Sequence, residues 1–189
     1  MIPTFSVLIG SIGRPVLKHT LDSIARQRRV PGDQVIVAID SFEQGDRPDV
    51  QALVRSYGDG FEVCAYDSGY HWLGVEQINY ALRTVPITGS HIFTMGDDDV
   101  FVDDAYLTLR TLCAAVPDRP ILYRFLTPEN ERGGRLVLWD RPELQINHIS
   151  GCCIAAPVAD VAPMTTERIV THDYFWIEDI VRRSNRDPM

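Results

Sequence analysis

The chain has 189 residues, a length typical of one compact domain. Hydrophobic residues make up 45% of it and charged residues 23%, which excludes disordered, collagen-like and low-complexity proteins. The net charge of −8 disfavours general nucleic-acid binding, because an acidic surface repels phosphate backbones.

Strands and helices are expected to alternate over about the first 120 residues. Apolar runs at residues 5–9, 34–39, 61–66 and 91–95 predict four strands. Apolar residues at helical spacing predict helices over residues 17–25, 48–57, 75–84 and 106–116, the last one capped by Asp103 or Asp104. This alternation predicts an α/β fold with a mostly parallel central sheet flanked by helices on both faces.

The C-terminal third is richer in strands. Residues 120–126, 135–139 and 146–155 have strand character, and the last run contains Gly151. An amphipathic helix is expected over residues 174–183, starting behind Asp173. We therefore expect a small antiparallel addition to the sheet and a single domain over residues 1–189.

The cysteines and the hydropathy pattern bear on the compartment. Cys64, Cys113, Cys152 and Cys153 form no CxxC pair, and the two adjacent ones are poorly placed to bridge each other. We expect reduced thiols in a cytoplasmic protein. No apolar run reaches the roughly 18 residues of a membrane span, and the N-terminus does not resemble a signal peptide.

Carboxylates follow three of the first four expected strands. Asp40 ends the second, Asp67 follows the third, and residues 97–99 (Asp-Asp-Asp) follow the fourth. In an open parallel sheet ligands bind beyond the carboxyl ends of the strands, so we expect these acids to converge on one site. The turn at residues 10–14 (Gly-Ser-Ile-Gly-Arg) could receive a phosphate or a base edge at a helix N-terminus. A plain tight turn is the alternative, since its GxxG spacing differs from the dinucleotide fingerprint.

The triple aspartate predicts a divalent-cation site. Three adjacent carboxylates repel one another unless a cation lies among them, and in an extended segment Asp97 and Asp99 point to the same side. Both could bind Mn²⁺ or Mg²⁺, with waters and a diphosphate completing the coordination. The alternatives are a solvated turn or a set of acids that cap the following helix, and the position directly behind a buried strand disfavours both. A helix–loop–helix calcium site is excluded, because the loop lacks the glycine that such a site needs at its sixth position.

Residues 6–27 (SVLIGSIGRPVLKHTLDSIARQ) resemble the opening of family 2-type glycosyltransferases of the GT-A fold. This opening has a strand, a short polar turn, an Arg-Pro pair and a helix. Asp40 and the cluster at residues 97–99 fall where that family has its nucleotide-binding acid and its DxD motif. Gly74 and Asn79 resemble the glycine and asparagine of the helix before the DxD strand, although Ile78 stands where an arginine often precedes the asparagine.

Two later segments extend the resemblance to most of the chain, about residues 5–183. Residues 149–151 (Ile-Ser-Gly) resemble the glycine-containing strand on the acceptor side. Residues 172–176 (His-Asp-Tyr-Phe-Trp) resemble the late acidic motif that opens the last core helix and supplies the catalytic base. Residues 1–100 would then form the nucleotide-binding half and residues 101–189 the acceptor-side half of a GT-A, Rossmann-like domain.

The resemblance implies a metal-dependent, inverting transfer of a sugar from a nucleotide-diphosphate donor, a UDP-sugar, to an acceptor hydroxyl. Asp173 would be the general base, with Asp179 as the alternative unless it pairs with Arg182 or Arg183 on a solvated helix face. Asp99 would hold the metal and Asp97 the ribose or the water shell of the metal, roles that Asp98 could exchange with them. The remaining implied contacts are to the donor (Gly10, Ser11, Arg14, Asp40, Asp67, Gly74, Asn79 and Asp98), to the acceptor (Gly151 and Trp176) and to the metal (His172, which could instead be exposed).

Two other functions remain open. A sugar nucleotidyltransferase has a related sheet but needs a lysine on the phosphates, and the only lysine in this chain is Lys18, inside the first predicted helix. A non-catalytic nucleotide-sugar-binding module would keep the fold without turnover. The acceptor is not identified by the sequence and could be a glycan, a lipid phosphate, a protein or a modified nucleobase.

Overall fold

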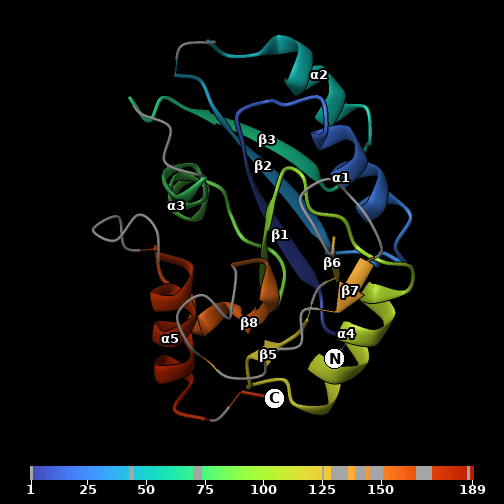
Figure 1. The fold of residues 1–189 in the computed structure, drawn as a ribbon, viewed down its shortest axis with the longest axis vertical. Helices are drawn as coiled ribbons and strands as arrows, with labels where there is room; N and C mark the ends of the chain where they lie inside the picture. Colours follow the sequence, from blue (N-terminus) through green and yellow to red (C-terminus); the bar gives the residue numbers. More distant parts are fainter. Residues whose placement is uncertain are drawn as a thin grey trace.

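The computed structural model describes residues 2–42, 45–69, 74–124, 126–128, 136–138, 144, 151–164, 172–186 and 188–189. The first part of the chain alternates strands and helices: β1 (Phe5–Ser11), α1 (Leu17–Ala25), β2 (Gln34–Asp40), α2 (Pro48–Arg55), β3 (Phe61–Tyr66), α3 (Val75–Thr84), β4 (His91–Gly96) and α4 (Ala105–Ala115). It continues with β5 (Ile121–Leu122), β6 (Leu126–Pro128), β7 (Leu136–Leu138), the 3₁₀ turn η1 (Gly151–Cys153), β8 (Ile154–Pro157), the 3₁₀ turn η2 (Val158–Asp160) and α5 (His172–Ser184). Figure 1 shows the arrangement of these elements.

A six-stranded sheet in the order β3-β2-β1-β4-β8-β5 forms the centre of the molecule. β1 pairs in parallel with both β2 and β4, and β8 pairs antiparallel with β4 and β5. β6 and β7 form a separate antiparallel pair. The predicted fold, a mostly parallel sheet with an antiparallel addition in the C-terminal third, is confirmed. The strand order reverses between β1 and β4, and such a switch point opens a crevice at the carboxyl ends of the two strands.

Both faces of the sheet are covered by helices (Figure 1). Side chains alternate along a strand, so Val7 and Ile9 of β1 pack with α1, α2 and α4, whereas Leu8 packs with α3 and α5. Right-handed crossovers explain this distribution: the chain moves outward from β1 through α1 and α2, then returns through α3 to the opposite side of β1. The reversal places α3 beside the crevice.

A buried ion pair fixes the other end of β1. Asp33, just before β2, accepts a hydrogen bond from the Phe5 N–H at 2.9 Å and pairs with Arg110 of α4 at 2.7 Å. Arg110 also lies over the Phe5 ring, 4.4 Å from its centroid. These contacts tie α4 to the amino ends of β1 and β2, opposite the crevice.

Two expected strands and one expected helix cap differ in the structure. The run at 120–126 divides into β5 and the start of β6, and β8 replaces the end of the expected strand at 146–155, of which residues 146–150 lie outside the described residues. The capping role expected of Asp103 or Asp104 is wrong. Asp104 precedes α4 in the left-handed conformation (φ 59°) and makes no side-chain cap. Its carboxylate lies instead 3.5 Å from Arg28.

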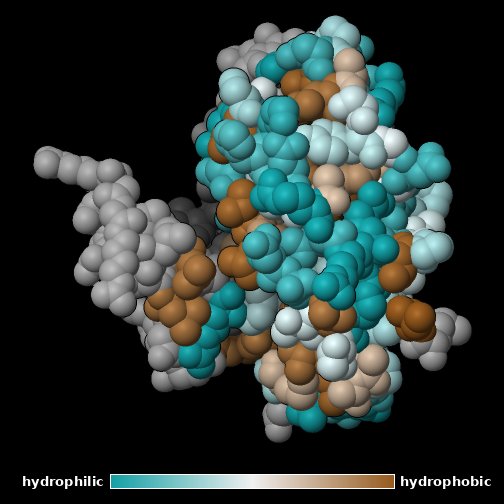
Figure 2. All heavy atoms as spheres, turned by 90° about the vertical axis from the view of Figure 1, so that its right-hand side faces the viewer, coloured by the Kyte–Doolittle hydropathy of each residue, from teal (hydrophilic) through white to brown (hydrophobic). Residues whose placement is uncertain are grey.

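Hydrophilic residues cover much of the side formed by α1, α2 and α4, and apolar residues occur there in separate spots (Figure 2). Within the described ranges, every helix is too short or too polar to cross a bilayer.

Candidate active site

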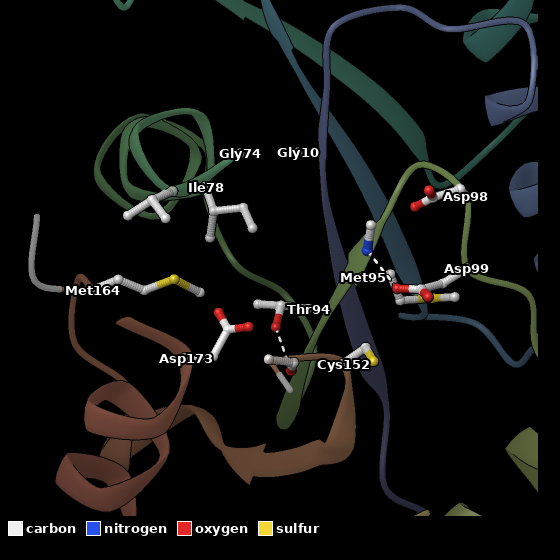
Figure 3. A pocket seen from close by; sticks show the side chains of 13 residues that line it. Gly10, Gly74, Ile78, Thr94, Met95, Asp98, Asp99, Cys152, Met164 and Asp173 are labelled. Atoms are coloured by element: carbon white, nitrogen blue, oxygen red, sulfur yellow. Dashed lines mark hydrogen bonds between the residues drawn. The ribbon is translucent and has the colours of Figure 1, made fainter. Parts of the chain in front are cut away.

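A cavity of about 310 Å³ lies at the carboxyl ends of β1 and β4, at the point where the strand order reverses. Figure 3 shows its walls, which come from β1, β4, α3, η1 and α5. It is lined by Gly10, Gly74, Val75, Ile78, Thr94, Met95, Gly96, Asp98, Asp99, Gly151, Cys152, Met164 and Asp173. Residues far apart in the sequence therefore meet at the crevice that the topology predicts.

Two glycines allow β1 and the start of α3 to approach closely. A Cβ atom at Gly10 would lie 2.7 Å from the Cα atom of Gly74. Gly74 itself has a φ of +86°, a conformation that side chains other than glycine rarely adopt. The two predicted donor-site glycines thus meet on one wall of the cavity, and their backbones are accessible there because neither carries a side chain.

Asp98 and Asp99 line one side of the cavity, directly behind β4 (Figure 3). Asp99 Oδ2 accepts a hydrogen bond from the Gly96 N–H at 2.7 Å, which closes a tight turn. Burial raises the pKa of Asp99 above its ordinary value, and the Asp98 and Asp173 carboxylates add to the increase. Hydrogen bonds from the Gly96 N–H and Cys152 oppose it. The negative charge at this wall is therefore destabilised unless a cation compensates for it.

Asp97 is held by the last residue of β1 and by the loop behind it. Ser11 Oγ donates to Asp97 Oδ2 at 2.6 Å, and Arg14 Nε donates to Asp97 Oδ1 at 2.9 Å. The side chain of Asp97 is buried, and the residue does not line the cavity that contains Asp99. The expectation that Asp97 and Asp99 face the same space is wrong, because the chain turns immediately after Gly96 instead of continuing as a strand.

Asp173 lies across the cavity from Asp98 and Asp99 (Figure 3). It belongs to the first turn of α5, one residue inside the helix, where the helix dipole favours a carboxylate. A Cβ atom at Gly151 would lie 3.0 Å from Asp173 Oδ1, so the missing side chain of Gly151 makes room for this carboxylate. Thr94 Oγ1 donates to the Gly151 carbonyl at 2.6 Å, which fixes η1 against β4. The side chain of His172 lies outside the described residues.

The acids behind β2 and β3 are not part of this cavity. Asp40 is buried and accepts hydrogen bonds from the Phe42 N–H at 3.0 Å and from Ser68 Oγ at 2.8 Å, which tie the ends of β2 and β3 together. Asp67 is exposed and accepts the Gly69 N–H at 2.9 Å within a local turn. The expected convergence of all the strand-end acids therefore holds for Asp98 and Asp99, but not for Asp40 and Asp67.

Asn79 and Trp176 hold the segment before residue 165 in place. Asn79 Nδ2 donates to the Met164 carbonyl at 2.9 Å, and the Met164 N–H donates back to Asn79 Oδ1 at 2.7 Å. Trp176 is buried and donates its indole N–H to the Ala162 carbonyl at 2.8 Å. Neither residue lines the cavity, but both position Met164, which does.

Asp179 faces a different part of the surface. It pairs with Arg182 and Arg183 at 2.5 Å each. Burial alone would raise the pKa of Asp179, but the two arginines lower it overall. Asp179 lines a separate cavity of about 300 Å³ with Phe175 and Glu178, away from the triple aspartate. Among the described acidic residues of α5, Asp173 is the one that lines the cavity with Asp98 and Asp99.

Another cavity, of about 360 Å³, adjoins the one that contains Asp99. The two share Gly10, Gly74, Gly96 and Asp98, and the second is completed by Ser11, Ile12, Arg14, Gln77 and Asp97. Arg14 lies 3.1 Å from Asp98 as well as against Asp97, and Asp97 raises the pKa of the Arg14 guanidinium. Together the cavities form a cleft with two compartments, one on either side of Asp98.

The chemistry of the cleft fits a divalent cation that shares its ligands with a substrate. Asp98 and Asp99 offer carboxylate oxygens, the donors that Mg²⁺ and Mn²⁺ prefer. Within the described part of the chain, no three histidine, cysteine or acidic side chains form a metal site by themselves. The fit is therefore to an ion held by one or two carboxylates, with waters and phosphates supplying the remaining ligands.

Solved structures with a similar fold include two complexes with a nucleotide or a nucleotide sugar. TarS from S. aureus (residues 1–349, in complex with UDP) matches 95% of this chain with a TM-score of 0.74 and 14% identity. The mannosyltransferase PcManGT from Pyrobaculum calidifontis, in complex with GDP-Man and Mn²⁺, matches 92% with a TM-score of 0.61 and 13% identity. The chain has the GT-A fold. It spans about half the length of these two structures, 55% of TarS 1–349 and 50% of PcManGT.

The same GT-A-type sheet also occurs in a nucleotidyltransferase-like protein. The 4-diphosphocytidyl-2C-methyl-D-erythritol synthase from Anaerococcus prevotii matches 99% of this chain and 85% of its own length, with a TM-score of 0.57 and 16% identity. No family model and no curated protein sequence matches the chain. At these sequence identities the structural similarity establishes the fold but not the reaction.

Three polar residues that line this GT-A cleft were not singled out from the sequence as site residues. Thr94 carries a signal in retrospect, because it is a polar residue within the apolar run of β4. Cys152 and Gln77 carry none, since a cysteine before a buried strand and a glutamine on an amphipathic helix are both ordinary. Their placement depends on contacts between distant segments.

Proposed function

We propose that the chain is a metal-dependent, inverting glycosyltransferase that uses a nucleotide-diphosphate sugar, a UDP-sugar, as donor. The observation that carries the proposal is the position of Asp173 across one cavity from Asp98 and Asp99 at the switch point of the sheet. The GT-A fold supports it, as do the complexes of TarS with UDP and of PcManGT with GDP-Man and Mn²⁺.

In this proposal Asp98 and Asp99 hold Mn²⁺ or Mg²⁺ together with the diphosphate of the donor. The ion would neutralise the charge that develops on the departing diphosphate. Asp97 does not bind the ion but orients Arg14, whose guanidinium lies beside Asp98 and adds positive charge at the junction of the two compartments. Gly10 and Gly74 leave backbone rather than side chains at this junction.

Asp173 acts as the general base on the opposite side. The acceptor hydroxyl oxygen forms a bond to the anomeric carbon as its proton passes to the Asp173 carboxylate. The bond from the anomeric carbon to the diphosphate breaks, and its electron pair leaves with the nucleoside diphosphate. A single displacement of this kind inverts the anomeric configuration. Gly151, held by Thr94, keeps the space beside the carboxylate open for the acceptor.

The two halves of the chain divide these tasks. Residues 1–100 supply the glycines and the metal-binding acids, and residues 101–189 supply Asp173 and Gly151 on the acceptor side. The mechanism requires only that the acceptor has a hydroxyl group. A glycan, a lipid phosphate, a protein or a modified nucleobase would each meet this requirement.

The test is the Asp173→Asn variant, assayed for nucleotide release from UDP-sugars and GDP-mannose with Mn²⁺. We expect turnover to fall by about 10²- to 10⁴-fold, the usual contribution of positioned proton transfer, while Mn²⁺-dependent donor binding stays unchanged. Asp179→Asn is the matched control on the same helix and should retain full turnover. Unchanged turnover in Asp173→Asn would remove Asp173 from the mechanism. Donor binding without turnover in the wild-type protein would favour a non-catalytic module.

A sugar nucleotidyltransferase is the second candidate, favoured by the match to the Anaerococcus prevotii synthase over 85% of its length. Such an enzyme needs a lysine on the phosphates. The only lysine here, Lys18, lies on the exposed side of α1, pairs with Asp22 at 2.7 Å and does not line either compartment of the cleft. Formation of a nucleoside triphosphate from a nucleotide sugar and pyrophosphate would establish this function instead.

A further inference from the structure

Gln77 of α3 is buried without a hydrogen bond to its carbonyl oxygen. Its side chain is 1% exposed, and Oε1 is one of four buried side-chain polar atoms without a partner in the described part of the protein. Burying such a group is unfavourable unless something satisfies it, so an unpaired one calls for an explanation. Asn79, two residues further along α3, is equally buried but exchanges two hydrogen bonds with Met164.

The unpaired carbonyl belongs to the second compartment of the cleft. Gln77 lies in the first turn of α3, directly behind Gly74, and lines the cavity of about 360 Å³ together with Ile12 and Arg14. It does not line the compartment that contains Asp173. A ligand that occupies both compartments would therefore have one end near Asp173 and the opposite end near Gln77.

The carbonyl oxygen of Gln77 can form hydrogen bonds with only some groups of a sugar nucleotide. Oε1 accepts hydrogen bonds, so its partner must carry an N–H or O–H group. An ionised diphosphate has only acceptor oxygens, whereas a nucleoside carries base N–H groups and ribose hydroxyls. The apolar side chain of Ile12 on the same cavity gives a surface for the base.

We propose that Gln77 accepts a hydrogen bond from the nucleoside of the donor sugar nucleotide. This inference rests on the proposed function and extends it to a residue that no motif of the sequence marks. The unfavourable burial of the carboxamide in the free protein is relieved when the base or ribose donates a hydrogen bond to Oε1.

The inference predicts opposite effects of one substitution on stability and on binding. Gln77→Met keeps the size of the side chain and removes the unsatisfied polar group, so we expect the ligand-free protein to melt about 2–4 °C higher. The matched control is Gln34→Met at the other end of the sheet. Gln34 is also buried, but its carboxamide bonds Ser6 at 2.8 Å and Glu62 at 2.7 Å, so this variant should melt lower and bind all ligands like the wild type.

Titration calorimetry with MnCl₂ distinguishes the contribution of the nucleoside to binding from that of the diphosphate. Wild-type protein is titrated with UDP, GDP, CDP, ADP and pyrophosphate, and the variants with pyrophosphate and the tightest of the four nucleotides. We expect Gln77→Met to weaken that nucleotide by up to about ten-fold, the effect of one good hydrogen bond, and to leave pyrophosphate affinity unchanged.

The outcomes that contradict the inference are distinct from failure of the proposed function. Equal weakening of nucleotide and pyrophosphate, unchanged nucleotide affinity, or a lower melting temperature of Gln77→Met would overturn the role of Gln77 while leaving a glycosyltransferase possible. A wild-type protein that binds none of the four nucleotides with Mn²⁺ would overturn the proposed function itself.

Discussion

The three adjacent aspartates behind β4 have different surroundings and therefore different roles. Asp97 is buried against Ser11 and Arg14, Asp98 is exposed at the junction of the two compartments, and Asp99 is partly buried in the first. A run of identical residues thus provides one structural carboxylate and two that are available to a cation. The tight turn at Gly96 separates them, because Asp99 folds back to accept the Gly96 N–H.

Asp99→Asn should stabilise the metal-free protein at neutral pH. The pKa of Asp99 is raised in the folded state, so its favourable contribution is present at low pH and is lost as the pH rises through the folded-state pKa. Above that pH the charged carboxylate opposes folding, and asparagine removes the charge but keeps an acceptor for Gly96. We expect a melting temperature about 2–4 °C above wild type at pH 7 and a vanishing difference below about pH 4. A variant that melts below wild type at pH 7 would contradict this interpretation.

Among the elements, the contact of β1 with α3 determines the shape of the cleft. Gly10→Ala places a methyl group 2.7 Å from the Gly74 backbone, so the strand and the helix must separate. We expect a loss of about 1–3 kcal/mol in the free energy of unfolding, together with weaker nucleotide binding.

The control for this change is Gly58→Ala. Gly58 has a positive φ, +83°, which Gly10 does not have, and nothing lies within 4 Å of its missing Cβ atom. Its substitution should lower stability through backbone strain alone and leave binding intact. Chemical denaturation combined with nucleotide titration distinguishes the two variants, and intact binding in Gly10→Ala would mean that the close approach does not shape the site.

Elements and individual side chains were not equally predictable from the sequence. The strands at residues 34–39 and 61–66 could be located within a residue, because short runs dominated by apolar residues leave little choice of structure. That Asp98 and Asp99 would lie at the carboxyl ends of the strands, beside a cavity, followed from parallel-sheet geometry. The partners of Asp97 and Asn79 could not be foreseen, because Ser11 is 86 residues from Asp97 and Met164 is 85 residues from Asn79. Such contacts depend on how distant segments pack, and no local pattern records them.

In the molecule as a whole, the cleft exists because the antiparallel addition completes the parallel sheet. β8 pairs with β4 on the side away from β1, so η1 is placed beside Thr94 and α5 beside η1. The wall that carries Asp98 and Asp99 comes from the first half of the chain and Asp173 from the second. The proposed reaction needs both walls, and the strand order β1-β4-β8 provides them.

Titration calorimetry of UDP against the wild-type protein, with MnCl₂ and then with EDTA, tests directly whether nucleotide binding in the cleft requires a metal ion. We expect heat of binding with Mn²⁺, none with EDTA, loss of binding in Asp99→Ala and full binding in Asp173→Asn. UDP uptake that is equal with and without the metal, or that survives in Asp99→Ala, would contradict the assignment of the Asp98–Asp99 wall to a cation that binds the nucleotide diphosphate.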